Sequence, residues 1–230
     1  MKTPTYLQPL ETAFQKNVDE GNASQMKKYM KNRYEFFGIK SPFRKEIYRE
    51  HKQKYGLIPS GKEEEIVKWC WQQPQREYQY FAMEFLNKTA RRSDTKIIEL
   101  YVFMITNKSW WDTVDFIASN LVGVFLQRFP QKTEALTTDW MKSGNMWLQR
   151  TCLLFQLKYK SAINTELLHQ FISQLSASNE FFIRKAIGWI LREYSKTDAE
   201  FVVDYVEKYP LSGLSQREAL KWLKNNFRHS

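Results

Sequence analysis

Hydrophobic residues recur along the chain at intervals of three or four positions and seldom alternate with polar ones. The pattern is clear over residues 66–70 (IVKWC) and again over residues 153–157 (LLFQL). Such intervals put side chains on one face of an α-helix, whereas a half-buried strand has a period of two. Only eight glycines and seven prolines interrupt the 230 residues. The pattern therefore predicts an all-α protein.

Several polar residues stand where these helices should begin. Ser109 with Asp112, and Ser215 with Glu218, have the spacing of a capping box, in which a serine side chain caps the helix and an acid three residues later answers it. Asn145 directly precedes another apolar run and is a good N-cap residue. We expect helices to start at these three positions.

Five segments can be stacked in one register: REYQYFAMEFL, WWDTVDFIASNL, MWLQRTCLLFQL, FFIRKAIGWIL and LSQREALKWL. Their anchor residues are Glu77, Trp111, Trp147, Phe181 and Leu214. The anchors follow one another at intervals of about 33 to 36 residues, a period typical of helix pairs in solenoids. The register predicts an α-solenoid of HEAT-like helical repeats with a concave basic face. We expect one domain over residues 1–230, with an N-terminal helical cap (1–70) and repeats (71–230).

Basic residues outnumber acidic ones by 35 to 25, which gives a net charge of +10. Some fall at fixed places in the register: Arg150, Arg184 and Arg217 three residues after an anchor, and Lys88, Lys158 and Arg192 eleven residues after one. Rows of cations suit a phosphate backbone. The segment 27–34 (KKYMKNRY) also mixes cations with aromatics, although a solvated helix face explains that pattern equally well.

The segment 108–115 (KSWWDTVD) holds two tryptophans and two carboxylates. Asp115 lies one helical turn after Trp111, on the same face, while Trp110 points about 100° away from Trp111. On spacing alone, the simplest interpretation of Asp115 is a solvated acid or an ion-pair partner. Trp189 likewise reads first as a core residue. Gly188 before it is unfavourable inside a helix, so a neighbouring helix or a ligand backbone should pass close to it.

Other classes of chemistry lack their residues. The chain has no glycine-rich phosphate loop and no His-Glu-x-x-His motif, and its three histidines are far apart in sequence, so metal catalysis is not expected. Cys70 and Cys152 form no Cys-x-x-Cys pair and should be buried free thiols. Apolar runs are too short to cross a membrane, and the N-terminus has no signal-peptide core, so we expect a soluble intracellular protein.

One carboxylate framed by tryptophans in a basic chain suits the stabilisation of a cation beside a polyanion, such as a glycosyl oxocarbenium on DNA. Here the sequence also resembles a known family. KSWWDTVD, WLQR followed by LLFQLKYK, FFIRKAIGWILREY, and YMKN followed by FFGIKSP are similar to the AlkD family of DNA alkylation-repair glycosylases. The resemblance runs through nearly the whole chain.

The resemblance implies a HEAT-like solenoid that removes N3- and N7-alkylated purines from duplex DNA in base excision repair, without metal or cofactor and without base flipping. Carried over residue by residue, it implies Trp111, Asp115 and Trp189 as the catalytic set. Arg150, Arg192 and Tyr29 match family positions at the DNA.

It also suggests a monomeric, cytoplasmic, nucleoid-associated protein of bacterial type with no membrane contact. Two alternatives stay open, which are a catalytically silent DNA-binding or scaffolding solenoid and a protein-interaction adaptor that never meets DNA.

Overall fold

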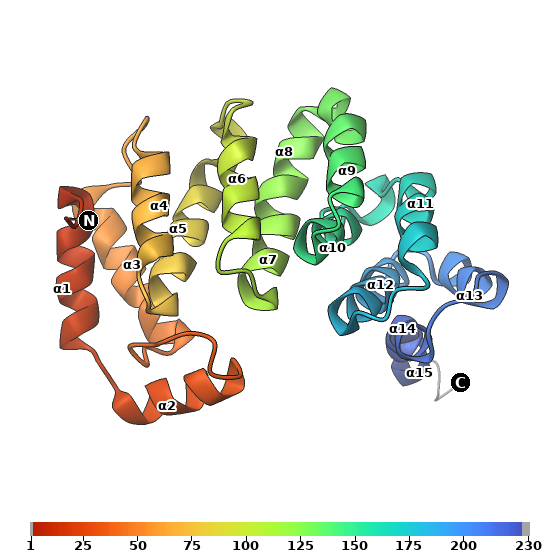
Figure 1. Ribbon diagram of the computed structural model, residues 1–230, viewed down its shortest axis with the longest axis horizontal. Helices are drawn as coiled ribbons and strands as arrows, with labels where there is room; N and C mark the ends of the chain where they lie inside the picture. The colour runs from red at the N-terminus through yellow and green to blue at the C-terminus, as the bar shows by residue number, and fades with distance from the viewer. Residues whose placement is uncertain (1, 227–230) are drawn as a thin grey trace. The chain divides into compact units, whose positions relative to one another are not determined.

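The fold is built from helices alone. The computed structural model describes residues 2–226, and in that part of the chain every regular element is a helix (Figure 1). An isolated bridge between Glu35 and Gln75 is the nearest approach to a strand among these residues. No helix within the described range has both the length and the apolar character that crossing a membrane requires. The all-α prediction is confirmed.

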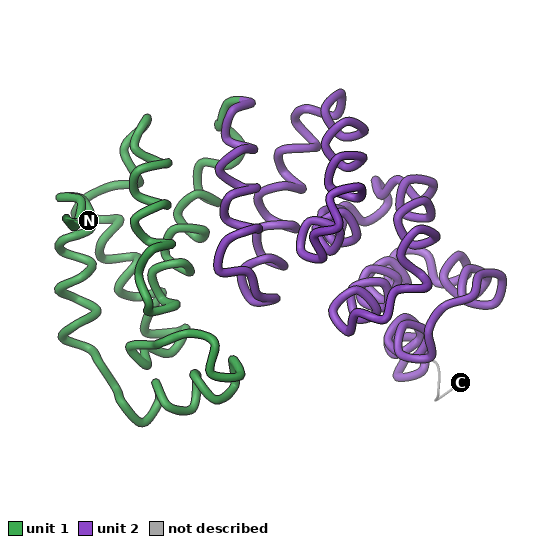
Figure 2. The backbone as a smooth tube through the Cα atoms, viewed as in Figure 1, with its two compact units in different colours: residues 1–94 green, residues 95–230 purple. Residues whose placement is uncertain are grey.

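The chain divides into two compact units, residues 1–94 and residues 95–230 (Figure 2). The division lies at residue 94 and not at residue 70, so the first predicted repeat, anchored at Glu77, belongs to the N-terminal unit. The expectation of one domain over the whole chain stays a prediction. Each unit is described by itself.

The N-terminal unit packs two helix pairs around an aromatic core. Phe14 of α1 contacts Tyr48 of α3 there. From α5, Tyr78 contacts the ring of Phe14 and Phe81 contacts the ring of Tyr48. Edge-to-face contacts of this kind add to the area that the rings bury. The helices are α1 (Gln8–Lys16), α2 (Glu20–Tyr29), α3 (Ser41–Tyr55), α4 (Glu63–Gln72) and α5 (Arg76–Thr89).

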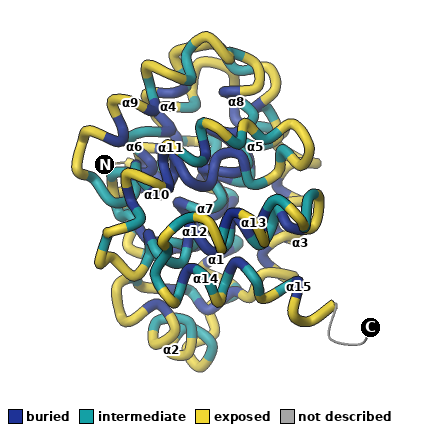
Figure 3. Tube along the Cα trace, turned by 90° about the vertical axis from the view of Figure 1, so that its right-hand side faces the viewer, coloured by how far each residue is buried: buried dark blue, intermediate teal, exposed yellow. Residues whose placement is uncertain are grey.

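Helix α2 differs from the others because none of its residues is buried (Figure 3). It is held through the loop that follows it. The buried carboxylate of Glu77, at the start of α5, accepts hydrogen bonds from the backbone N–H groups of Phe37, Gly38 and Ile39 at 3.1, 3.0 and 3.2 Å. Gly38 has a φ of +87°, and a Cβ there would overlap the backbone of Asp19. Residues outside α2 therefore fix its position.

His51 of α3 is a buried histidine surrounded by aromatic rings, and its Nε2 atom has no hydrogen-bond partner. Burial lowers its pKa to about 4. The unfolded chain, with a histidine pKa near 6.5, binds more protons than the folded one between pH 4 and 6.5, so stability should fall as the pH drops through this window.

The loss between pH 7.5 and pH 5 should be about 2 kcal/mol. Urea unfolding at pH 5 and 7.5 measures it, and His51→Leu should lose clearly less between the two pH values. Equal losses in both proteins would assign the effect to other groups.

The C-terminal unit continues the pattern of helix pairs. Helix α7 runs without a break through a π-helical segment (Ile117–Val122) into α8. Both cysteines of the chain are buried and free, as predicted. The helices are α6 (Ile97–Thr106), α7 (Trp111–Phe116), α8 (Gly123–Arg128), α9 (Thr133–Lys142), α10 (Met146–Leu154), α11 (Thr165–Leu175), α12 (Phe181–Tyr194), α13 (Ala199–Lys208), α14 (Gly213–Ala219) and α15 (Lys221–Asn226).

The predicted register matches the helices. Each of the five anchors is the first or second residue of its helix, namely α5, α7, α10, α12 and α14. Five residues further on, the small side chains Ala82, Cys152, Ala186 and Ala219 are all buried. The repeat of helix pairs is therefore confirmed, and its anchors mark where the second helix of each pair begins.

Two of the three predicted caps are wrong. Asn145 does cap α10, accepting from the N–H groups of Trp147 and Leu148. Helix α7, however, is capped at Trp110, and the Ser109 hydroxyl donates instead to the Ile105 carbonyl of the preceding helix. Helix α14 begins one turn earlier than predicted, because Ser212 accepts from the N–H of Ser215. Glu218 is thus not part of a capping box.

Candidate active site in the C-terminal unit

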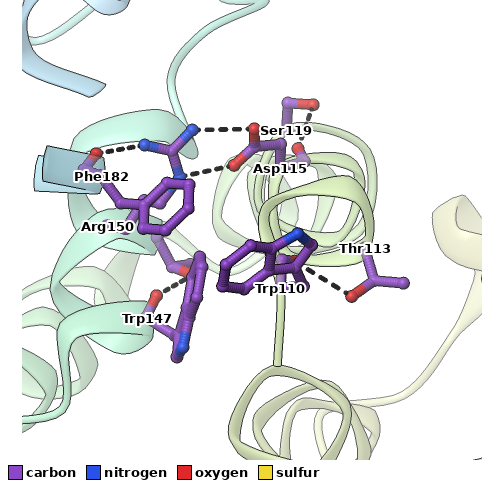
Figure 4. A network of polar contacts seen from close by, with 8 residues as sticks. Trp110, Thr113, Asp115, Ser119, Trp147, Arg150 and Phe182 are labelled. Atoms are coloured by element: carbon purple, nitrogen blue, oxygen red, sulfur yellow. Dashed lines mark hydrogen bonds and ion pairs between the residues drawn. The ribbon is translucent and has the colours of Figure 1, made fainter. Parts of the chain in front are cut away.

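Asp115 and Arg150 form a largely buried, bidentate ion pair (Figure 4). Nε of Arg150 donates to Oδ1 of Asp115 at 2.7 Å, and Nη2 donates to Oδ2 at 2.8 Å. The side chains are 4% exposed for Arg150 and 13% for Asp115. Asp115 comes from α7 and Arg150 from α10, thirty-five residues later in the chain. Of the two readings left open for Asp115, the ion-pair partner is the one observed.

Arg150 also reaches a third helix. Its Nη1 donates to the backbone carbonyl of Phe182 in α12, and its guanidinium carbon lies 5.9 Å from the Phe182 ring centre. Arg150 is therefore surrounded by protein groups from three helices. A direct contact between Arg150 and the DNA backbone stays a prediction, while this geometry supports a role in holding Asp115.

Two opposing effects set the charge state of Asp115. Burial raises the pKa of its carboxyl group, and the hydrogen bonds and positive charge of Arg150 oppose that rise. Each carboxylate oxygen gives one lone pair to Arg150, and a carboxylate has about four such acceptor positions. An ionised Asp115 therefore keeps the capacity to accept hydrogen bonds from a water molecule.

The two neighbouring tryptophans have different surroundings. Trp110 is buried and packs edge-to-face on Phe182, with ring centres 4.9 Å apart (Figure 4). Its ring is tilted against that of Trp147, with ring centres 5.9 Å apart. Trp111, one helical turn before Asp115, is only half-buried. Trp110 is thus the packing residue, which leaves Trp111 as the ring with solvent-accessible surface beside Asp115.

Local backbone features on both sides of Asp115 are unusual. Lys108, which opens the loop before α7, has a φ of +47°, a left-handed conformation that is rare for a residue with a side chain. The π-helical segment begins two residues after Asp115, and its Ser119 donates to the Asp115 carbonyl at 2.9 Å. Short π-helical turns are frequent at functional sites.

Trp189 and Arg192 lie in α12, the helix that supplies the Phe182 carbonyl. Trp189 is half-buried. A Cβ on Gly188 would overlap Glu218 of α14 and lie 2.7 Å from the Ser215 carbonyl oxygen. A neighbouring helix therefore passes close to Gly188, which is one of the two explanations expected for this glycine. Arg192 donates from Nη1 to Oε2 of Glu218 at 2.7 Å.

Tyr29 belongs to the N-terminal unit, at the last position of α2. Its side chain is 69% exposed, the largest exposed fraction of any large hydrophobic residue in the described chain. Lys27 and Lys28 precede it in the last turn of the helix. The structure therefore leaves Tyr29 accessible, and its contact with DNA stays a prediction.

The pairing of Asp115 with Arg150 was not predicted from the sequence, although the repeat register contained a signal for it. Asp115 is four residues after one anchor and Arg150 three residues after the next. Equivalent and adjacent positions of stacked helices lie close together, so opposite charges there indicate an ion pair. As for metal sites, residues 2–226 contain no group of three or more His, Cys, Asp or Glu side chains placed to hold an ion.

Comparisons with known proteins identify the family of the chain. The family model described as DNA alkylation repair enzyme matches residues 10–223. A solved structure of a predicted DNA alkylation repair enzyme from Enterococcus faecalis superposes with a TM-score of 0.82 at 30% sequence identity, covering 90% of this chain and 97% of that one. The search of curated proteins gave no match. The chain belongs to the DNA alkylation repair enzyme family.

Proposed function

We propose that this DNA alkylation repair enzyme is an N-glycosylase that hydrolyses the bond between deoxyribose and a cationic N3- or N7-alkylated purine in duplex DNA. The observation that carries the proposal is the largely buried Asp115 carboxylate, held by Arg150 one turn from the half-buried Trp111. A fixed anion in a site of low polarity is the group best suited to stabilise a positive charge that develops during a reaction.

The lesion decides which groups the reaction needs. The alkylated base already carries a positive charge, so it leaves with the electron pair of the C1′–N bond and needs no proton from the enzyme. The sugar is left as an oxocarbenium ion, which Asp115 would stabilise. Water then adds to C1′ through its oxygen and releases a proton to the surrounding solvent, and the remaining lone pairs of Asp115 can orient that water. No step in this sequence requires a metal or a cofactor.

Arg150 has a cost and a benefit in this mechanism. A carboxylate about 4 Å from the oxocarbenium would contribute ~4 kcal/mol at an effective dielectric constant near 20, while a guanidinium about 8 Å away would oppose it by ~2 kcal/mol. Arg150 also opposes the rise of the Asp115 pKa that burial causes. Arg150 thus favours the ionised form of Asp115, which is the form that can stabilise the cation.

Aromatic side chains supply the other surfaces of the proposed site. The faces of Trp111 and Trp189 would contact the deoxyribose cation. The base itself would be held weakly, so it need not leave the stack, and the few kcal/mol of base flipping would be spared.

We propose that the enzyme acts as a monomer in the cytoplasm, on the nucleoid.

Release of 7-methylguanine from a defined duplex, with EDTA present, tests the proposal. Uracil at the same position of a second duplex should be released far more slowly, because uracil is neutral and is a poor leaving group without protonation. Equal rates on both duplexes would contradict the mechanism. Duplex binding without any base release would favour the alternative, a catalytically silent DNA-binding scaffold.

A further inference from the structure

A second cluster of charges lies on α12 around Trp189. Lys185, Trp189 and Arg192 are spaced at i, i+4 and i+7, so they share one face of the helix, with a cation one turn on each side of the ring. Both cations are bound to one acid from α14. Nζ of Lys185 lies 2.8 Å from Oε1 of Glu218, and Nη1 of Arg192 lies 2.7 Å from Oε2.

The packing of α12 on α14 makes this arrangement possible. Gly188 has no side chain to separate the two helices, and the Glu218 stem occupies the space that a Cβ would fill. Ser215 of α14 adds a hydrogen bond from its hydroxyl to the Arg184 carbonyl at 2.9 Å. The glycine before Trp189 thus lets a carboxylate from another helix reach cations on both sides of the tryptophan.

Glu218 is poorly placed for the stability of its own helix. It is the penultimate residue of α14, where the helix dipole disfavours an acid. Its carboxylate is nevertheless kept ionised, because the hydrogen bond from Lys185 and the nearby positive charges lower its pKa. The two cations therefore account for an acid at this position.

The cations remain accessible while the acid is largely covered. The exposed fractions of the side chains are 36% for Lys185 and 26% for Arg192, against 16% for Glu218. An ammonium group has three N–H donors and a guanidinium five, so each keeps donors beyond the one directed to Glu218. The cluster has a net charge of +1 and presents cationic donors on both sides of Trp189.

The family resemblance already implies that Arg192 contacts DNA. We infer that Lys185 is a second cation for the phosphodiester backbone on the other side of Trp189, and that Glu218 is the positioning residue that holds both cations in place. The inference deepens the proposed function and rests on it. Without Glu218, two long cationic side chains one turn from the same ring would repel each other and lose a defined position.

The test compares Glu218→Gln with Glu193→Gln, a control on α12 that makes the same change in charge at a residue paired with Lys196. Binding to an undamaged duplex is measured against salt, and excision of 7-methylguanine is measured at saturating enzyme. Glu218→Gln should bind at least as tightly as the wild type, yet excise about 10- to 100-fold more slowly because the strand is misplaced. The control should match the wild type in both.

Two outcomes would overturn the inference. One is a wild-type excision rate in Glu218→Gln, and the other is a fall in its thermal midpoint together with its binding, which would make Glu218 a packing residue. A second pair of variants tests the cations themselves. Lys185→Gln and Arg192→Gln should each reduce the slope of log K against log salt by about 0.9, and unchanged slopes would contradict phosphate binding. These slopes stay informative even if the wild type excises no base.

Discussion

Asp115→Asn should excise 7-methylguanine about 10³-fold more slowly than the wild type, measured as single-turnover base release at saturating enzyme. The expected loss follows from removing a carboxylate about 4 Å from the oxocarbenium, which contributes ~4 kcal/mol. Asparagine has nearly the same shape, so binding of undamaged duplex should change little. The effect should therefore appear in the rate and not in the affinity.

The matched control for Asp115→Asn is Asp112→Asn, which makes the same change in charge three residues earlier on α7. Its rate should stay close to that of the wild type. The Asp115 variant leaves Arg150 buried without its anion, so unfolding has to be measured alongside activity, at a temperature where both proteins are folded. A folded Asp115→Asn protein with a wild-type rate would remove Asp115 from the mechanism.

Arg150→Met should lower the free energy of unfolding by about 3–5 kcal/mol at pH 7, because the Asp115 carboxylate would remain buried without its partner. The pKa of Asp115 should then rise further, since Arg150 now opposes the effect of burial. A raised carboxyl pKa in the folded state means that stability is lost as the pH increases through that pKa. The variant should therefore be closest to wild-type stability at low pH.

The higher pKa of Asp115 in Arg150→Met should affect activity in the opposite direction from stability, lowering activity at low pH. If the ionised carboxylate is the active form, the acid limb of the rate profile should move to higher pH in Arg150→Met. The double variant Asp115→Asn/Arg150→Met, which carries neither charge, should recover much of the stability and none of the activity. An unshifted acid limb in a folded Arg150→Met protein would show that Arg150 does not control the charge of Asp115.

Local sequence patterns predicted the helices well. The starts of α5, α7, α10, α12 and α14 follow from five anchors, because the apolar face that each helix buries repeats with the register. The predicted serine caps at Ser109 and Ser215 are wrong for a local reason. Helix α7 begins one residue later, with Trp110 as its N-cap, and α14 begins three residues earlier, with Ser212 as its N-cap. Spacing alone cannot fix the residue at which a helix begins.

Contacts between helices were the part that sequence reasoning missed. The face shared by Trp111 and Asp115 is a property of one helix and could be predicted. The partner of Asp115 depends on how α7 and α10 align, which the sequence of either helix leaves open. The ion pairs of Arg150 and Glu218 could be identified only from the structure, which places their charges against neighbouring helices. Comparing equivalent and adjacent positions in successive repeats would have suggested both the Glu218–Lys185 pair and the Asp115–Arg150 pair.

The hydrogen bonds that Arg150 makes to α7 and α12 limit how this chain can evolve by duplication of its helical repeats. Helical repeats are often gained or lost as whole modules, because each one contacts mainly its neighbours. Here the carboxylate, its cation and the carbonyl that fixes the cation come from three successive modules. A module inserted between α7 and α10 would preserve the helical packing yet separate Asp115 from Arg150. The smallest unit that can be inherited or transplanted with its chemistry intact is therefore a run of three modules.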